Sequence, residues 1–154
     1  MKALRINHVS VHAEDLEESV GFYEQLFGME RIPTPRFQGE VVWLRLGDQQ
    51  LHLFLREGTE PPLAHHLGLD VDDFDSVYRQ AKERGLLDGD VFDQAIRMHP
   101  LGWVQMYLRD PAGNLVEVDW PDVNTLSPDV QAEVGRLEDE VVQTGDAARA
   151  SLFT

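Results

Sequence analysis

The sequence predicts an α+β fold built from two copies of one β-α-β-β-β module, whose strands form a curved mixed sheet shaped as a half-barrel, followed by a C-terminal helix. Two alternating stretches led by a histidine, His8–Asp15 and His66–Asp73, each run into an acidic helix start. A later strand of each half carries one metal-competent side chain between apolar neighbours, His52 in the first half and Glu117 in the second. A repeated order of elements is typical of a duplicated supersecondary unit.

The first module covers about residues 4–57. Alternation over 6–12 predicts a strand with one apolar face and one face rich in imidazoles. The acidic residues at 14–18 suit a helix N-terminus, and an apolar stripe at helical spacing predicts a helix that ends at Gly28. Three short strands follow, at 30–32, 41–46 and 51–55, with a hairpin turn at 47–50.

A linker at 58–62 precedes the second module, about residues 64–120, in which the same elements recur. The pattern predicts a strand at 66–71 and a helix whose buried stripe covers 74–81. We expect three further strands, near 91–92, at 104–108 and at 115–118, the last two joined by a turn at 110–114. Residues 1–120 are therefore expected to form one domain of two modules.

Residues 121–154 lie outside the duplication and are expected to form a C-terminal helical extension. Ser127 is a typical helix cap and Pro128 fits the first turn. Apolar residues at helical spacing between 130 and 141 give the predicted helix one buried face. We expect this helix to pack on the domain or on a second subunit.

Composition excludes several classes of protein. The 154 residues include no cysteine, which rules out disulfide scaffolds, thiolate zinc sites and cysteine nucleophiles and agrees with a reducing cytosol. A formal net charge of −15 argues against a nucleic-acid partner, because phosphate binding needs a basic face. No apolar stretch is long enough for a signal peptide or a membrane span, so we expect a cytoplasmic protein that contacts no membrane.

The repeated positions suggest one metal site to which each module contributes two ligands. Three imidazoles and one carboxylate suit Fe(II), Mn(II), Co(II), Ni(II) or Zn(II) rather than Mg(II) or Ca(II), which prefer oxygen ligands. Four protein ligands on an octahedral ion leave two adjacent positions open. A small substrate with two neighbouring oxygens could bind there, with the metal acting as a Lewis acid.

Four segments resemble the vicinal oxygen chelate superfamily over about residues 4–120: His8-Val9, Phe22–Met29, His65–Asp73 and Tyr107–Glu117. The resemblance to its glyoxalase and methylmalonyl-CoA epimerase members implies the fold of paired modules and a divalent metal held by His8, His52, His66 and Glu117. The histidine at position 52 departs from glyoxalase I, which has a catalytic glutamate there. This departure argues against lactoylglutathione lyase activity.

A second resemblance concerns the last strands. The signature of type I extradiol dioxygenases is similar to the pattern formed here by His99, Tyr107, the turn that follows it, and Glu117. One position differs, because Arg97 stands where that signature prefers a small or β-branched residue. The resemblance implies an Fe(II) triad of His8, His66 and Glu117. His52 would then be an acid–base residue beside the metal, and His99 and Tyr107 would hydrogen-bond the substrate oxygens.

The remaining candidates are less specific. Trp43, Phe54 and Trp103 could line an aromatic substrate pocket or simply pack in the core, and His12 could line the pocket or lie at its rim. An extradiol-type dioxygenase is the favoured function. A metal-dependent lyase, isomerase or epimerase acting through an enolate, and a metal-free ligand-sequestering protein of the bleomycin-resistance type, stay open.

We also expect a homodimer, because an open half-barrel exposes sheet edges that pairing with another chain would cover. The sequence does not decide whether the site forms within one chain or across two.

Overall fold

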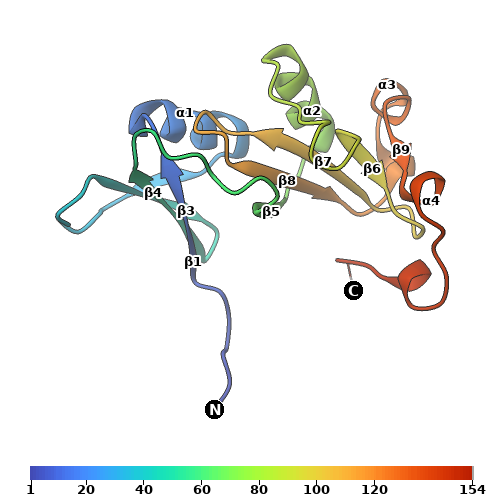
Figure 1. The fold of residues 1–154 in the computed structure, drawn as a ribbon, viewed down its shortest axis with the longest axis horizontal. Helices are drawn as coiled ribbons and strands as arrows, with labels where there is room; N and C mark the ends of the chain where they lie inside the picture. The colour runs from blue at the N-terminus through green and yellow to red at the C-terminus, as the bar shows by residue number, and fades with distance from the viewer. Residues whose placement is uncertain (154) are drawn as a thin grey trace. The chain divides into compact units, whose positions relative to one another are not determined.

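The computed structural model describes residues 1–153, and its fold is α+β as predicted (Figure 1). Contacts divide the chain into two compact units. Unit 1 comprises Met1–His65 together with Asp110–Asn114, and unit 2 comprises His66–Arg109 with the chain from Leu115 onward. Each unit has its own open mixed sheet, of four strands in unit 1 and five in unit 2. The two predicted modules thus form two mixed open sheets, neither of which is closed into a barrel.

The strands of unit 1 lie in the order β1-β4-β3-β2, with β1 parallel to β4 and the other neighbours antiparallel. A two-residue turn joins β3 to β4, and Gly47 in that turn has a φ of 58°, which a glycine adopts without strain. The elements are β1 (His8–Ala13), α1 (Leu16–Phe27), β2 (Glu30–Ile32), β3 (Val41–Leu46) and β4 (Gln49–Leu55).

Helix α1 forms where the sequence predicts it. The Asp15 carboxylate accepts a hydrogen bond of 2.9 Å from the Glu18 N–H and so caps the N-terminus, and Gly28 ends the helix in the left-handed conformation. The apolar side of α1 and one face of the sheet make a fully buried core, in which Phe22 and Tyr23 are the largest side chains. Since strand side chains alternate, the imidazoles of β1 occupy the other face of the sheet.

A buried polar cluster ties the 110–114 turn to unit 1. The Tyr23 hydroxyl donates to Asp110 Oδ2 at 2.9 Å, and the Asn114 amide donates both to the same oxygen and to the His12 carbonyl, each at 2.7 Å. Asp110 Oδ1 accepts from the Ala112 and Asn114 N–H groups. Burial raises the pKa of Tyr23 and of Asp110. The turn was predicted, and its aspartate is fully occupied by structural hydrogen bonds.

The strands of unit 2 lie in the order β5-β8-β7-β6-β9. Strand β5 is parallel to β8, and β6, β7 and β8 are antiparallel neighbours. The first five elements are β5 (His66–Asp70), α2 (Phe74–Glu83), β6 (Ile96–Met98), β7 (Val104–Arg109) and β8 (Leu115–Trp120). As in unit 1, the helix follows the first strand, so both units have the predicted β-α-β-β-β order.

The strand expected near 91–92 is wrong, because the strand that pairs with β7 is β6, at Ile96–Met98. The Asp88 carboxylate accepts from the N–H groups of Asp90 and Val91 and holds that stretch in a turn. Asp93 then adopts a φ of 61°, which breaks an extended chain.

The continuous helix expected after residue 121 is also wrong. The segment instead contains five short elements, η1 (Val123–Thr125), α3 (Pro128–Gln131), β9 (Gly135–Arg136), α4 (Leu137–Glu140) and η2 (Ala147–Arg149). Helix α3 starts at Pro128 as predicted, but the Ser127 hydroxyl accepts from Arg79 and does not cap the helix. Pairing of β9 with β6 supplies backbone hydrogen bonds that a longer helix would have made internally.

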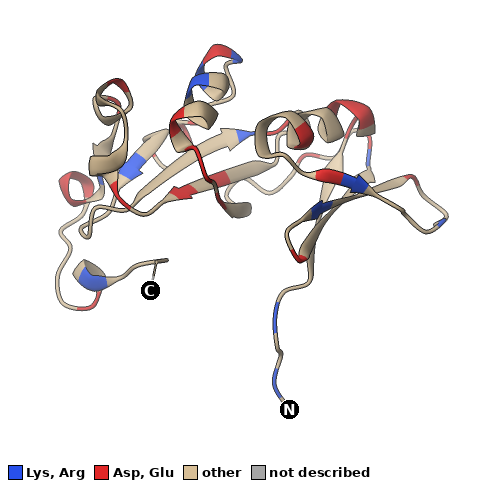
Figure 2. Ribbon diagram, turned by 180° about the vertical axis from the view of Figure 1, so that it is seen from behind, with Lys and Arg blue, Asp and Glu red and all other residues tan. Residues whose placement is uncertain are grey.

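Charged side chains cover both units. Acidic positions occur on helices, strands and loops, with the fewer Lys and Arg scattered among them (Figure 2). Within residues 1–153, no helix is both long and apolar enough to cross a membrane.

Candidate functional site

In unit 1, two predicted metal ligands lie side by side on neighbouring strands. The rings of His8 in β1 and His52 in β4 are stacked, with centroids 4.5 Å apart and planes 18° apart. Trp43 in β3, the cross-strand partner of His52, stacks on the histidine's other face at 4.2 Å and 4°. The three strands therefore place three aromatic rings in one stack on the face opposite the α1 core.

Hydrogen bonds set which ring nitrogens are available. His8 Nδ1 lies 2.5 Å from the Asn7 side-chain oxygen and so donates to it, which leaves a lone pair on Nε2 for a metal. His52 Nε2 donates to the Gln50 side-chain oxygen at 2.8 Å, which leaves its lone pair on Nδ1. Burial, followed by the electrostatic effect of the neighbouring His8 ring, lowers the pKa of His52 and keeps this imidazole neutral at pH 7.

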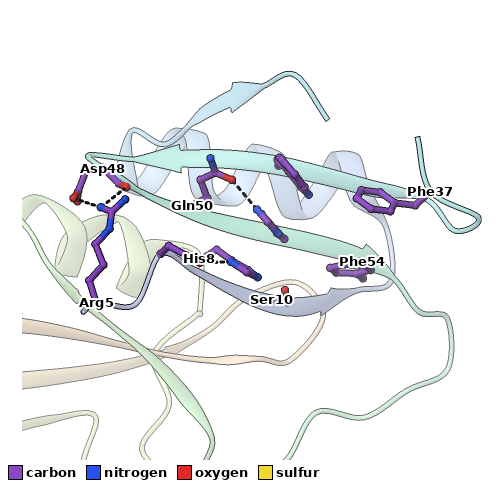
Figure 3. Close-up of a pocket in the computed structure, with 10 residues that line it drawn as sticks. Arg5, His8, Ser10, Phe37, Asp48, Gln50 and Phe54 are labelled. Atoms are coloured by element: carbon purple, nitrogen blue, oxygen red, sulfur yellow. Dashed lines mark hydrogen bonds and ion pairs between the residues drawn. The ribbon is translucent and has the colours of Figure 1, made fainter. Parts of the chain in front are cut away.

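A cavity of about 550 Å³ opens beside this stack within unit 1 (Figure 3). Phe37 and Phe54 lie at one end of it, while Arg5, Asp48 and Gln50 lie at the other. The aromatic residues predicted from unit 1 therefore line a hollow that also contains the two imidazoles. His12 is not among the lining residues, which are Arg5, Asn7, His8, Ser10, Phe37, Trp43, Asp48, Gln50, His52 and Phe54.

In unit 2, the other two predicted ligands also meet. His66 Nε2 in β5 lies 3.5 Å from Glu117 Oε2 in the adjacent strand β8. The His66 side chain is 35% exposed and that of Glu117 only 8%. Gly68, the cross-strand partner of Glu117, adds no side chain beside the carboxylate. This pair offers one nitrogen and one buried carboxylate to a metal ion.

The two residues expected to contact substrate oxygens share a partner that the sequence did not reveal. The Tyr107 hydroxyl donates to the side-chain oxygen of Gln105 at 3.0 Å, and His99 Nε2 donates to the same oxygen at 2.6 Å. Tyr107 is also the cross-strand partner of Glu117. Burial and the Glu117 charge raise the pKa of Tyr107, while burial lowers that of His99. Period-two alternation from Tyr107 places Gln105 on the same face and could have identified it.

Asp119 is a second buried carboxylate that sequence reasoning missed. It lies two residues beyond Glu117 in β8, on the same face, and is 4% exposed. Burial and then the Glu117 charge raise the pKa of Asp119 to about 7. Its Oδ1 atom is buried without a hydrogen-bond partner among residues 1–153. The same alternation from Glu117 would have predicted its position.

Trp103, a predicted pocket residue, belongs to unit 2. Its ring stacks on His99 with centroids 3.6 Å apart, and its indole N–H donates to the Ala150 carbonyl at 3.1 Å. Phe153 contacts the same ring edge-on. The C-terminal segment therefore packs on Trp103, which is 6% exposed.

The structure brings the four predicted ligands together as two pairs, one in each unit. In the described part of the chain, no three His, Asp or Glu side chains are gathered so that they could hold a metal ion. The donor types nevertheless fit a divalent transition metal, because His8 presents a free Nε2 lone pair and Glu117 is a buried carboxylate beside His66.

Comparison with known proteins identifies the family. The model of the Glyoxalase/Bleomycin resistance protein/Dioxygenase superfamily matches residues 5–118, which include both ligand pairs. The chain belongs to this superfamily. The match ends before the C-terminal segment, which lies outside the duplicated modules of the superfamily domain.

Relatives within the superfamily have different activities. The mitochondrial methylmalonyl-CoA epimerase of Homo sapiens is 27% identical over 131 residues, covering 75% of this chain and 73% of the epimerase. Among solved structures, a lactoylglutathione lyase from Agrobacterium tumefaciens matches with 26% identity and a TM-score of 0.58. The oxidase ChaP-H2 matches with 25% identity and a TM-score of 0.62; both matches cover 77% of this chain and 94% of the solved one. Membership therefore leaves the reaction open.

Proposed function

We propose that this protein is a metal-dependent enzyme that binds a small substrate through two neighbouring oxygens, and that it cleaves an aromatic ring in the manner of an extradiol dioxygenase. The main support for the proposal is that the candidate ligands form a pair at the same position of each module. In each unit the first strand supplies a histidine, and the strand parallel to it supplies the second metal-competent side chain. Fe(II) is the metal proposed for ring cleavage, with Mn, Co, Ni or Zn for the other chemistries.

We assign His8, His66 and Glu117 as the metal ligands and His52 as an acid–base residue beside them. An imidazole lone pair lies in the plane of its ring, so two stacked rings direct their lone pairs side by side rather than toward one point. His52 is also neutral, and its Nε2 hydrogen is committed to Gln50. A neutral imidazole with a lone pair on Nδ1 can accept a proton from a substrate hydroxyl.

The bound metal would supply Lewis acidity toward the two substrate oxygens. The residues of the chain would do the rest. Gln105 orients His99 and Tyr107, because its one amide oxygen accepts from both. The buried Tyr107 keeps its proton at neutral pH, since burial and Glu117 raise its pKa, so its hydroxyl stays a hydrogen-bond donor. The aromatic end of the unit 1 cavity suits a planar ring.

The test has two stages. Protein purified without chelator is analysed for transition metals, and apoprotein is then loaded anaerobically with Fe(II). We expect about one equivalent of metal per chain. Oxygen uptake is measured next with a panel of catechols. Oxygen uptake together with formation of a ring-cleaved product would support dioxygenase activity. Less than about a tenth of an equivalent of metal after reconstitution would instead favour a metal-free binding protein.

A second candidate is an epimerase or another enzyme acting through an enolate. The similarity to methylmalonyl-CoA epimerase over three quarters of the chain favours it, and neutral His52 could remove the proton next to a carbonyl. Incubation of the Co(II)-loaded protein with methylmalonyl-CoA in D₂O distinguishes the two. Deuterium at the α-carbon without oxygen uptake would support the enolate reaction over ring cleavage.

A further inference from the structure

A buried guanidinium lies on the second sheet outside the proposed metal ligands. Arg97 in β6 is 9% exposed, and it is the only Lys or Arg that is buried among residues 1–153. Burial of a cation is costly unless charge and hydrogen bonds compensate it. In a chain with a formal net charge of −15, an arginine that is kept inside rather than on the surface needs an explanation.

The hydrogen bonds of Arg97 are incomplete. Its Nη2 donates to the Phe92 carbonyl and to Glu140 Oε2, the latter at 3.0 Å. Its Nε is buried and has no partner among the described residues. A guanidinium can bind both oxygens of one carboxylate through Nε–H and a neighbouring Nη–H. Glu140 therefore accepts from Nη2–H only and leaves Nε–H without an acceptor.

Arg97 lies next to the residues proposed to contact substrate. Its cross-strand partner is Gln105, whose side-chain oxygen holds both His99 and Tyr107. The Arg97 charge helps to lower the pKa of His99, after the larger effect of burial. The Arg97 charge thus acts on both His99 and Tyr107, as does the opposite charge of Glu117.

The carboxylate that contacts Arg97 comes from the end of a short helix, and the residues that follow it are exposed. Glu140 ends α4, a helix of four residues, and its side chain is 26% exposed against 11% for Arg97. Val141 and Val142, which follow it, are 59% and 82% exposed. Segments with few buried contacts open at low free energy. Glu140 can therefore leave Arg97 without unfolding the sheet.

We propose that Arg97 is the binding site for the carboxylate of a small organic ligand, and that Glu140 occupies this site until the ligand displaces it. The ligand carboxylate would accept from both Nε–H and Nη2–H, which Glu140 does not. The identification of this ligand with the substrate rests on the proposed function, since it requires the remainder of the molecule to reach the metal ligands. Binding of the carboxylate itself requires no metal.

The carboxylate site is tested on metal-free, ¹⁵N-labelled protein by following the Arg97 Nε–H resonance during titration with sodium benzoate. The Arg97→Lys variant assigns the resonance, because it lacks this group. In Glu140→Gln the competing charge is gone, and we expect benzoate to shift the resonance with an affinity about tenfold higher than in the wild type. The neutral analogue benzamide should leave the resonance unmoved in both proteins.

Glu138→Gln is the matched control, because Glu138 belongs to the same short helix but pairs with Arg136. It should behave as the wild type. If benzoate leaves the Arg97 resonance unmoved in Glu140→Gln, or if Glu138→Gln gives the same gain, the proposal is wrong. The titration is measured only on proteins that keep Arg97, and Arg97→Lys serves only to assign the resonance.

A second arm uses Zn(II)-loaded protein and compares catechol with 3,4-dihydroxybenzoate, which differ only by a carboxylate. We expect Arg97→Gln to weaken 3,4-dihydroxybenzoate about tenfold relative to catechol. Equal losses for both ligands would show that the carboxylate site is not part of the substrate site. Failure of catechol to bind the loaded wild type would count against the proposed function, while the benzoate titration would still decide the carboxylate site.

Discussion

The immediate neighbours of each metal-competent residue decide what its side chain can do. Asn7 orients His8 so that Nε2 is available, whereas Gln50 holds the Nε2 hydrogen of His52. Glu117 is buried beside His66, with a second carboxylate two residues away. Two histidines, or two carboxylates, thus differ in their available atoms and in their pKa because their burial and hydrogen-bond partners differ.

The ligand assignment predicts unlike effects for two adjacent histidines. His66→Ala should lose metal binding, because one of the three proposed ligands is removed, while the free energy of unfolding of the apoprotein changes by about 1 kcal/mol or less. His65→Ala is the matched control and should keep full occupancy. Metal content by mass spectrometry and urea unfolding measure the two quantities. Retention of metal in His66→Ala would remove this residue from the site.

His52→Ala separates the two roles considered for this residue. If His52 is an acid–base residue, the variant keeps about one equivalent of metal and loses turnover by about a hundredfold or more. If it is a ligand, metal content falls together with turnover. Metal stoichiometry and steady-state rates on the same preparation make the comparison, and loss of metal would overturn the acid–base assignment.

Asp119 should make the stability of the metal-free protein depend on pH. The pKa of Asp119 is raised from 3.8 to about 7 in the fold, so ionisation of this carboxyl destabilises the folded state. The protein has its full stability below pH 3.8, and this part of the stability is lost as the pH rises through about 7. Asp119→Asn removes this penalty and should be more stable than the wild type at pH 8 by about 2 kcal/mol, with little difference at pH 4. Unfolding in urea with chelator present measures both.

Asp72→Asn, at an exposed position, makes the same change in charge and serves as the control. It should show no such dependence on pH. An Asp119→Asn variant less stable than the wild type at pH 8 would mean that the carboxylate has a favourable partner in the fold.

At the scale of elements, the two modules share an order of strands and helices but differ in how their helices are held. Tyr23 in α1 donates to a buried aspartate of the 110–114 turn, whereas Tyr78 in α2 accepts from the surface residue Lys82. The turn at 110–114 is thus part of the core of unit 1, although it follows β7 in the chain.

This difference predicts unequal effects of one substitution. Tyr23→Phe removes a hydroxyl that Asp110 needs, so we expect a loss of about 1–3 kcal/mol in the free energy of unfolding. Tyr78→Phe removes the same atom from a part-buried pair with the exposed Lys82 ammonium and should cost about 0.5 kcal/mol or less. Urea unfolding at pH 7 provides both values. Equal losses would show that the buried cluster adds nothing specific.

At the scale of the whole molecule, the four candidate ligands form two pairs, one in each unit. Most homo-oligomers are twofold-symmetric dimers, so a site shared between two chains would occur twice in each dimer. We propose that the expected homodimer forms each metal centre from the His8–His52 pair of one chain and the His66–Glu117 pair of the other.

Mixing two defective chains tests this arrangement. His8→Ala and His66→Ala should each be inactive alone, but refolding them together should restore about a quarter of the wild-type sites, because half of random dimers are mixed and each mixed dimer has one intact site. Metal content and sedimentation of the mixture measure the restoration. No restoration would place all the ligands of a site within one chain.

The sequence by itself determined the repeated β-α-β-β-β order, the ends of α1 and the family, because these depend on local periodicity, capping residues and turn chemistry. It also predicted four candidate ligands, which the structure places as two pairs, and the aromatic residues Trp43 and Phe54, which line the cavity of unit 1. Tertiary structure decided the strand pairing and the burial of individual side chains, which local sequence patterns do not contain. Pairing of β9 with β6 replaced the long C-terminal helix, and Asp88 turned the stretch expected as a strand. In unit 2, the fold buried Gln105, Asp119 and Arg97. In the sequence, those three residues look like ordinary polar residues of a strand. The free energy of burying a polar side chain and its pKa both depend on the partners that the fold places beside it.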